Sequence, residues 1–461
     1  MKKNYQIASQ LVLALLLTAC SLPNDERNIY LKSVTADMQF LASDDLKGRL
    51  AGSSEITVAE NYIAKQFQQA GLQPLKGLNS YKQSFTLHRY LPNKLKVNLN
   101  QKNIHAENIA LAGSIRTISW NKESAKHIVI GKNDDLRSSL KSLNQQGENT
   151  IVLIDSTHQE MFAKYRNKFA NGSQSLDSRA PAAIVLILTD ETEINTIEVS
   201  ASIDHQQQTL SNVIGVLPGK SKADEFVVFS AHHDHLGSQA ADINGNSQDL
   251  IYNGANDDAS GVTAVLNLAR YYASPVNSSN NERSIMFVTF TAEESGLLGS
   301  SHFVNDIDAD SITAMLNIEM IGKPSEFGAG TYWMTGYERS NLATILQQNL
   351  SANSNNAKQQ IFADPYKKYG LFYRSDNASL AKLGVPAHSL SSTQMSNDHD
   401  YHQVSDEIAT LDLEQMTTII NSIASASSSL IDGSDTPARI EKIVPRAQGL
   451  FFNPLKFQYI L

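Results

Sequence analysis

The sequence predicts an α/β fold with a mostly parallel central sheet, helices on both faces and an inserted small β-rich domain. From residue 211 onward, strand-like runs alternate with helix-like runs, a pattern typical of a parallel sheet covered on both sides. Residues 98–204 differ, because short β-like segments there alternate with polar stretches. The composition is that of a soluble globular chain, with 461 residues of which 41% are hydrophobic and 18% charged.

The first residues predict an export signal. Lys2 and Lys3 precede an apolar run at 11–17, which is too short to span a bilayer of about 30 Å. The sequence Leu-Thr-Ala-Cys at 17–20 closely resembles a bacterial lipoprotein box. We therefore expect removal of residues 1–19 and lipidation of Cys20, and an ordinary signal peptide with an incidental cysteine is the alternative.

Cys20 also sets limits on the rest of the chain. Residues 20–27 would tether the protein to a membrane, and Ser21 resembles the residue that directs Gram-negative lipoproteins to the outer membrane, facing the periplasm. Because Cys20 is the only cysteine, an intramolecular disulfide is impossible and a metal site must use histidine and carboxylates. The formal charge of −9 argues against a nucleic-acid partner, since phosphate binding needs a basic surface.

Two helices are expected before the insert. Apolar residues recur at steps of three and four from residue 28, at Leu31, Val34, Met38 and Leu41. A second helix begins at 53–55 and ends at Gly71, with a glycine-rich loop at 46–52 that either edges a pocket or only connects the helices. We assign 28–97 and 205–433 to the main domain, 98–204 to the insert and 434–461 to a tail.

The remaining elements of the main domain follow from the hydrophobic pattern. Short apolar runs predict strands, and segments in which apolar residues recur with a period of 3.6 predict helices. We expect strands at 213–217, 226–231, 285–290, 312–318 and 387–390, and helices at 260–272, 296–304, 342–350, 378–383 and 411–430.

A polar cluster follows the strand at 226–231. This apolar strand ends in His232-His233-Asp234-His235. Core packing does not require such residues there, whereas open α/β sheets bind ligands beyond the carboxyl ends of their strands. Because side chains alternate along an extended segment, His232 and Asp234 lie on the same side. That spacing suits an imidazole ligand with a carboxylate that orients its surroundings.

Acidic residues also gather at the next two turning points of the chain. Asp257 and Asp258 lie in a loop that enters a helix, where they could instead be solvated charges that complement the helix dipole. Glu293 and Glu294 follow the strand at 285–290, and adjacent side chains there point in different directions. One of the two glutamates can therefore bind a metal while the other faces a substrate water.

Glu319 and His402 complete the set of candidate ligands. Glu319 ends an otherwise apolar strand, where a buried carboxylate without a partner would be costly. Asp400-Tyr401-His402 supplies a second imidazole. Histidines and carboxylates are the nitrogen and oxygen ligands of zinc. Two histidines and three carboxylates are too many for one catalytic zinc, and they suit two ions bridged by a carboxylate.

Five motifs in order carry a resemblance to a known family: AHHDH, NGANDDASG, FTAEESGLLGS, LNIEM and DYH. They resemble the co-catalytic di-zinc aminopeptidases of clan MH, of the bacterial leucyl aminopeptidase, aminopeptidase S and aminopeptidase Y types. LASDDLKGRLAGS and NVIGVLPG resemble the segments that precede the site motifs in that family. The resemblance covers about 28–97 and 205–430, and the insert resembles a protease-associated domain.

The resemblance implies a zinc-dependent exopeptidase that hydrolyses N-terminal residues from peptides, with two zinc ions per chain. It implies that His232 binds one zinc ion with Asp234 behind it, that Asp257 bridges both ions and that Glu293 is the general base. Glu319 would be a further ligand of the zinc ion that His232 binds, and Glu294 and His402 would bind the other zinc ion. Tyr401, beside His402, would donate a hydrogen bond to the oxyanion.

Three positions depart from the family pattern. Asn256 replaces an acid beside the bridging aspartate, Glu319 replaces an aspartate, and Asn377 replaces a histidine. We expect structural or supporting roles for the histidines and acids that the pattern does not use: His233, His235, His302, His399, Asp258 and Asp400. Arg374 and Asp376 are candidates for substrate contact.

Three other functions are weighed against the aminopeptidase. A glutaminyl cyclase shares the fold but uses one zinc ion. A carboxypeptidase-like or dipeptidase relative shares more of the site and would act at a free C-terminus. A non-enzymatic receptor on a peptidase fold would be expected to lose ligands, and this chain retains all of them. The oligomeric state does not follow from the sequence.

Overall fold

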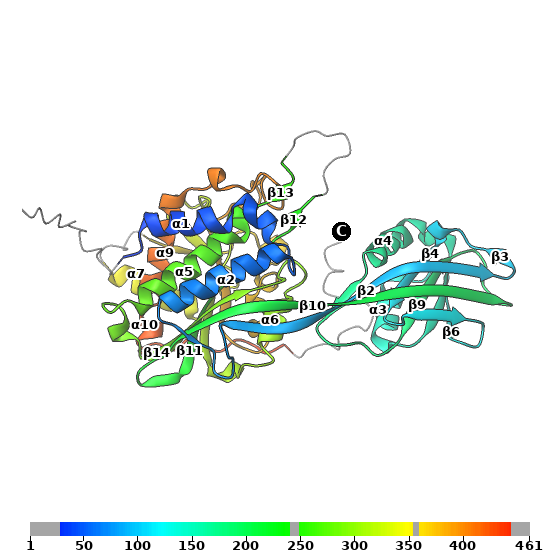
Figure 1. Cartoon of the computed structure of the whole chain (residues 1–461), viewed down its shortest axis with the longest axis horizontal. Helices are drawn as coiled ribbons and strands as arrows, with labels where there is room; N and C mark the ends of the chain where they lie inside the picture. The colour runs from blue at the N-terminus through cyan, green and yellow to red at the C-terminus, as the bar shows by residue number, and fades with distance from the viewer. Residues whose placement is uncertain (1–27, 240–248, 354–358, 444–461) are drawn as a thin grey trace, which may run out of the picture.

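The computed structural model describes residues 28–239, 249–353 and 359–443, and consists of two bodies joined by a pair of long strands (Figure 1). The expected signal peptide 1–19, the tether 20–27 with Cys20, and residues 444–461 of the expected tail lie outside the described residues. Among the described residues, none of the helices has the length and apolar character needed to cross a membrane.

The centre of the main sheet is parallel, as predicted. β11 (Lys222–His232) lies between β14 (Arg283–Phe290) and β15 (Ile312–Ile318), and runs parallel to both. β15 in turn pairs in parallel with β18 (Ala387–Ser391). Every residue of β14, β15 and β18 is buried, as expected for strands covered on both faces. Their carboxyl ends therefore meet at one edge of the sheet.

On each flank of this parallel centre the adjoining strand is antiparallel. β10 (Ile197–Leu217) pairs with β14 in this way, and β16 (Tyr332–Met334) with β18. At one end of the sheet, β16 and β17 (Ile361–Ala363) pair in parallel. The strand order is β17-β16-β18-β15-β11-β14-β10-β2-β3. The remaining short strands are β1 (Gln73–Pro74), which pairs with β10, β3 (Lys102–Asn103), and the hairpin β12 (Gly237–Ser238) and β13 (Ile251–Tyr252).

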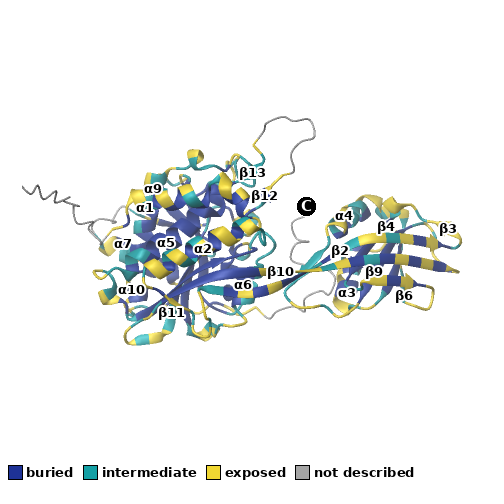
Figure 2. Cartoon of the chain, viewed as in Figure 1, coloured by how far each residue is buried: buried dark blue, intermediate teal, exposed yellow. Residues whose placement is uncertain are grey.

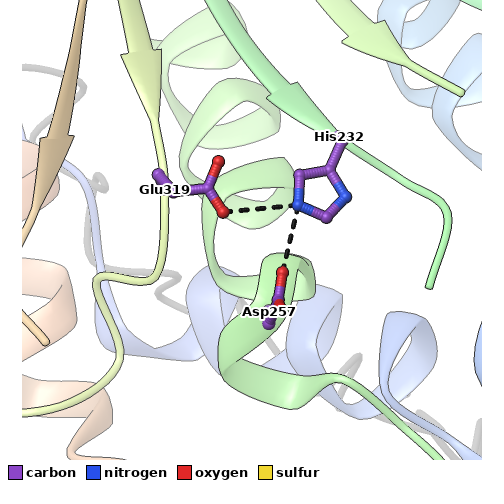
Figure 3. Close-up of side chains that lie close together, drawn as sticks. All are labelled: His232, Asp257 and Glu319. Atoms are coloured by element: carbon purple, nitrogen blue, oxygen red, sulfur yellow. Dashed lines mark hydrogen bonds and ion pairs between the residues drawn. The ribbon is translucent and has the colours of Figure 1, made fainter. Parts of the chain in front are cut away.

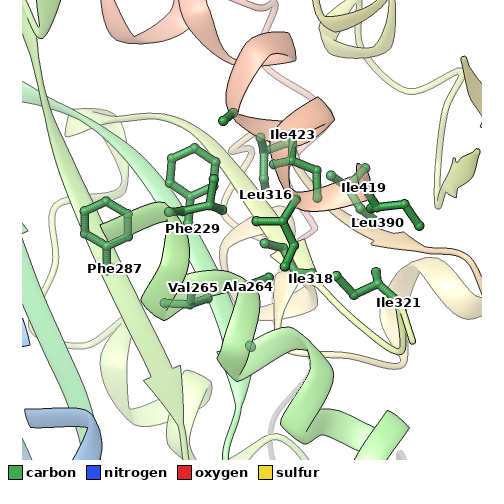
Figure 4. Close-up of a cluster of buried hydrophobic side chains, with 14 of the residues drawn as sticks. Phe229, Ala264, Val265, Phe287, Leu316, Ile318, Ile321, Leu390, Ile419 and Ile423 are labelled. Carbon is green, nitrogen blue, oxygen red and sulfur yellow. The ribbon is translucent and has the colours of Figure 1, made fainter. Parts of the chain in front are cut away.

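Helices cover both faces of this sheet, as predicted. On one face, Leu316 and Ile318 of β15 pack against Val265 and against Ile423 of a C-terminal helix (Figure 4). The helices on this face are α1 (Leu31–Leu41), α2 (Ser54–Gln69), α5 (Ser260–Ala273), α7 (Leu342–Ala352), α9 (Leu413–Ala426) and α10 (Ser428–Ile431). The opposite face is covered by α6 (Leu298–Phe303) and α8 (Asn377–Ala381).

The smaller body is built on the far halves of β2 (Lys82–Leu99) and β10, which pair over the whole length of β2. The expected domain boundaries at 97/98 and 204/205 therefore fall within continuous strands. Both bodies have buried interiors of their own (Figure 2). The smaller one contains a separate sheet of order β4-β9-β7-β6, formed by β4 (Ile109–Gly113), β6 (Lys126–Ile130), β7 (Thr150–Ile154) and β9 (Ala183–Leu188). It also contains the helices α3 (Leu136–Gln146) and α4 (Gln159–Ala170). Two short strands of the large sheet, β5 (Thr117–Trp120) and β8 (Ser173–Ser175), pair with β10 and β2.

Arg49, in the loop between α1 and α2, ties the N-terminal helices to the edge where the strands end. Its guanidinium is buried and donates hydrogen bonds to the carbonyl oxygens of Leu41, His233, Asn253 and Gly254, at 2.6 to 3.0 Å. The loop at 46–52, for which the sequence leaves two roles open, thus holds the segment after β11 in place.

We predict that Arg49→Ala destabilises the fold by about 3 kcal/mol or more, because four buried carbonyl oxygens lose a charged donor. Urea unfolding at a fixed zinc concentration measures the change. Lys47→Ala is the matched control in the same loop, since Lys47 is exposed and pairs only with Glu55 at the surface. If Arg49→Ala lowers the free energy of unfolding no more than Lys47→Ala does, this role is contradicted.

Candidate metal centre

The first group of candidate ligands comes from two neighbouring strands and a turn. His232 ends β11, Glu319 follows β15, and Asp257 lies in the turn Ala255–Ala259 before α5. His232 Nε2 lies 3.1 Å from Asp257 Oδ1 and 3.3 Å from Glu319 Oε1 (Figure 3). Because β11 and β15 are parallel neighbours, their ends bring these side chains together.

The second group uses the other oxygen of the same aspartate. His402 Nε2 lies 3.2 Å from Asp257 Oδ2 and 3.3 Å from Glu294 Oε2. Glu294 follows β14, and His402 comes from the loop between β18 and α9. Asp257 therefore lies between the two groups and presents one carboxylate oxygen to each.

These separations fit metal ligands. Two donors bound to one zinc ion at 2.0–2.2 Å with tetrahedral geometry lie about 3.3 to 3.5 Å apart. The described residues contain two clusters of donor atoms able to hold an ion, namely His232 with Asp257 and Glu319, and His235 with Asp257 and Glu294. Oε1 of Glu294 is buried and accepts no hydrogen bond of good geometry, although His235 Nδ1 lies 2.9 Å away, and a buried carboxylate oxygen of this kind is stabilised by a cation. The residues present thus fit zinc.

The backbone adopts left-handed conformations at three positions around the centre. Ala292, just before Glu293, has φ of 55°, Met320, just after Glu319, has φ of 53°, and His402 itself has φ of 58°. Residues with a Cβ rarely adopt this region, and such strain collects at functional sites. Here it turns the chain sharply beyond each strand end and directs the acidic and imidazole groups toward the same space.

Asp234 lies behind His232, but the atom nearest the imidazole is the backbone oxygen of Asp234 rather than the carboxylate that the sequence led us to expect. His232 Nδ1 lies 3.0 Å from the backbone oxygen of Asp234 and 3.7 Å from its Oδ1. That carboxylate oxygen instead accepts a hydrogen bond from the backbone N–H of Glu293, at 3.0 Å. Asp234 therefore links the orientation of the imidazole to the position of Glu293.

Glu293 lines the cavity beside both groups. Burial raises the pKa of its carboxyl well above the usual range in the metal-free protein, and the carboxylates of Glu294 and Glu319 contribute in the same direction. A carboxyl group in such surroundings is suited to exchange a proton with a neighbouring water. Tyr401 lines the same cavity, with its ring stacked on that of His402 at 3.9 Å between centroids.

The cavity is lined by both acidic and apolar side chains. Glu293, Glu294 and Glu319 contribute carboxylates, and Arg374 adds a positive charge. The apolar side chains of the lining are those of Met320, Trp333, Leu371 and Met395. Asp376 is fully buried and does not line the cavity, so of the two candidates for substrate contact only Arg374 lies where a ligand can reach it.

The positions that depart from the family pattern are accommodated by local contacts. Asn256 donates to Thr393 Oγ1 at 2.8 Å and accepts from the backbone of Gly322 at 2.9 Å, so it supports the turn that holds Asp257. The longer side chain of Glu319 reaches His232 and also accepts a hydrogen bond from Ser375 at 2.6 Å.

Asn377 and Asp258 support the scaffold. Asn377 donates to the backbone oxygens of Phe372 and Ala387, at 2.9 and 3.1 Å. Asp258 accepts from the backbone N–H groups of Gly261 and Met320, at 3.0 and 3.1 Å. Both therefore hold elements that surround the centre.

Of the remaining polar residues, only His235 lies beside the candidate ligands. His302 stacks on Phe85 and His233 contacts Thr289, both away from the two groups. Asp400 binds Lys323 at 2.7 Å and His399 lines a separate surface hollow. His235 is different, because its Nδ1 lies 2.9 Å from Glu294 Oε1. Sequence reasoning assigned it a supporting role, since adjacent histidines in a loop cannot be ranked without their directions.

Comparison with known proteins agrees with this geometry. The model of Peptidase family M28 matches residues 212–427, which hold every candidate ligand described above. This stretch, the M28 segment, is thus similar to the peptidases of that family. The chain is 28% identical over 216 residues to a probable leucine aminopeptidase of Arthroderma otae, covering 44% of this chain and 53% of that protein. It is 31% identical over 138 residues to aminopeptidase YwaD of Bacillus subtilis, covering 29% and 27%.

Solved structures extend the likeness beyond the M28 segment to the whole fold. The aminopeptidase from Aneurinibacillus sp. strain AM-1 superposes with a TM-score of 0.53 at 20% identity, covering 91% of this chain and 97% of that one. BSAP, a zinc aminopeptidase from Bacillus subtilis, gives 0.52 at 18% identity, covering 93% and 99%. These likenesses establish the fold. The chain spans about half the length of the first curated relatives it matches.

We predict that zinc binding to the metal-free protein releases protons and strengthens as the pH rises from about 6 to about 9. Burial lowers the pKa of His402, but Asp257 and Glu294 outweigh this and raise it to about 10. The protonated imidazole stabilises the metal-free state fully below the ordinary histidine pKa of about 6.5, and this contribution is lost as the pH approaches the folded value. Zinc must therefore displace the proton.

Calorimetric titration of zinc in two buffers of different ionisation enthalpy measures the protons released. His402→Gln is the control, because its amide carries no proton to lose and fewer protons should appear. Binding that releases no proton, or an affinity that falls as the pH rises, would contradict the prediction.

Proposed function

We propose that the chain is a zinc-dependent exopeptidase, and specifically an aminopeptidase that hydrolyses N-terminal residues from peptides. The observation that carries the proposal is the position of Asp257, whose Oδ1 faces His232 and whose Oδ2 faces His402. A carboxylate shared in this way suits two ions rather than one. This favours the aminopeptidase over a single-zinc cyclase on the same fold.

In this proposal the chain holds two zinc ions. His232, Asp257 and Glu319 hold one, and Asp257, Glu294 and His402 hold the other. When bound, the ions lower the pKa of a water molecule and polarise the scissile carbonyl. The protein supplies the positions of the ligands, and Asp234 supports His232 through its backbone oxygen.

Glu293 acts as the general base. Its carboxylate takes a proton from the attacking water and delivers it to the leaving amine, so the same group serves both halves of the hydrolysis. The backbone N–H of Glu293 is fixed by Asp234, which limits how far the carboxylate can drift. Tyr401 lines the cavity and donates a hydrogen bond to the oxyanion that forms from the carbonyl.

The cavity indicates the kind of substrate. Its carboxylates favour a free α-ammonium group, and the apolar side chains of Met320, Trp333 and Met395 in its lining favour an apolar first side chain. Arg374 supports a second candidate, because its guanidinium could bind the free C-terminal carboxylate of a short peptide. A dipeptidase or carboxypeptidase-like enzyme would use Arg374 in that way.

The protein is further proposed to act at the cell envelope. Lipidation of Cys20 would anchor it in the outer membrane with the enzyme facing the periplasm, where short peptides are its partners. The support for this is the signal-like segment at 1–19 and the lipoprotein-box residues that precede Cys20.

We predict that Glu293→Gln lowers kcat by about a hundredfold or more, since general-base catalysis contributes on that scale. Zinc content should stay that of the wild type, because Glu293 is not a ligand in the proposal. Metal analysis alongside turnover of an aminoacyl substrate measures both. Glu282→Gln is the control, because Glu282 lies at the opposite end of β14 and should leave turnover unchanged. Retained activity in Glu293→Gln would remove the base assignment.

A panel of peptides separates the two candidates. For the aminopeptidase we expect cleavage of peptides with a free N-terminus whether or not the C-terminus is amidated, and no cleavage when the N-terminus is acetylated. Dependence on a free C-terminal carboxylate, lost in Arg374→Ala, would instead support the dipeptidase or carboxypeptidase-like candidate.

A further inference from the structure

We propose that His235 is a further metal ligand, which joins Asp257, Glu294 and His402 at the second metal position. The inference rests on the proposed function, because it requires the two-metal centre. It changes the account of that centre, since the two positions then differ in how many protein donors they have.

The first support is the place of the imidazole. The side chain of His235 is fully buried, and its Nδ1 lies 2.9 Å from Glu294 Oε1 and 3.9 Å from Asp257 Oδ2. Two donors on one zinc ion can lie no more than about 4.4 Å apart, given bonds of up to 2.2 Å. Both separations are therefore compatible with a common ion.

The second support is that Nδ1 and Oε1 are close without being hydrogen bonded. Neither His235 Nδ1 nor Glu294 Oε1 has a hydrogen-bond partner, although both atoms are buried. At 2.9 Å the two atoms form an ion pair when the imidazole is protonated, but their geometry is not that of a hydrogen bond, so each buried atom lacks a well-directed partner. An ion bound by both atoms gives each of them a partner.

The third support is that the surroundings hold the ring in this place. The ring packs over Gly254, where a Cβ would come within 2.6 Å of His235 Cγ. The backbone N–H of His235 donates to Arg49 at 3.2 Å, and Arg49 in turn donates to Gly254 at 3.0 Å. The imidazole is thus preorganised beside Glu294, and the ring of His402 meets it edge-on at 5.8 Å between centroids.

The consequence is an asymmetric centre. The position of His232, Asp257 and Glu319 has three protein donors and resembles a catalytic zinc site, which keeps a place for water or substrate. The position of Asp257, Glu294, His402 and His235 has four protein donors, the number typical of a structural zinc site. We expect the second position to hold its ion more tightly and to exchange it more slowly.

The test uses the full mature chain, stripped of metal and titrated with Co²⁺ alone, whose visible spectrum depends on the ligands. We expect the wild type to bind two ions in distinguishable steps. In His235→Ala the tighter step should weaken roughly tenfold or more, its spectrum should change, and added imidazole should restore both. His233→Ala is the matched control, because this buried neighbour contacts Thr289 rather than the centre.

The outcomes separate the inference from the proposed function. Two ions bound by His235→Ala with wild-type affinity and spectrum would overturn the inference and leave the proposed function standing. Weaker binding with an unchanged spectrum would also overturn it, because His235 would then only orient Glu294. A wild type that binds fewer than two ions would overturn the proposed two-metal function itself. If His235→Ala does not fold, as judged by circular dichroism, His235→Asn replaces it.

Discussion

Negative charge buried at one edge of a sheet is the constraint on which the rest of this structure depends. Asp257, Glu293, Glu294 and Glu319 meet beyond the ends of three parallel strands, where Asp257 is buried and the three glutamates are only partly exposed. Carboxylates in such a place repel one another and lose their hydration, so they need bound cations or protons. In the metal-free chain the imidazoles of His232 and His402 offset this charge, because the neighbouring carboxylates outweigh burial and raise their pKa values, and bound zinc would offset it further.

The scaffold is arranged to bring this charge together. The parallel centre of the sheet brings the ends of β11, β14 and β15 to one edge, and buried apolar residues on both faces hold those strands in register. Left-handed residues such as Ala292 and His402 then turn the chain into the centre. Arg49 holds the segment after β11 from outside, so the N-terminal helices support the site without contributing a ligand.

Much of this arrangement could be predicted from the sequence. The strand at 312–318 was predicted with the bounds of β15, and the helix at 260–272 differs from α5 by a residue at its end. Long segments with a clear period are predictable because burial requires that period. The polar residues at strand ends were also identifiable, since nothing in core packing accounts for them, and the structure brings all five predicted ligands together.

Other features depend on tertiary contacts that no local pattern encodes. His233 and His235 are neighbours in the same motif, yet one turns toward Thr289 and the other toward Glu294. Likewise, β2 and β10 run through both bodies, so the change of composition near residue 98 does not coincide with the end of a strand. The role of Arg49 could not be predicted, because three of its four carbonyl partners, those of His233, Asn253 and Gly254, lie far from it in the sequence.

The most direct test of the central claim is X-ray diffraction from crystals of the zinc-loaded protein, recorded on both sides of the zinc absorption edge. The account predicts two anomalous peaks, one on each side of the Asp257 carboxylate, with His232 and Glu319 at one and Glu294 and His402 at the other. A single peak, or peaks away from Asp257, would contradict it.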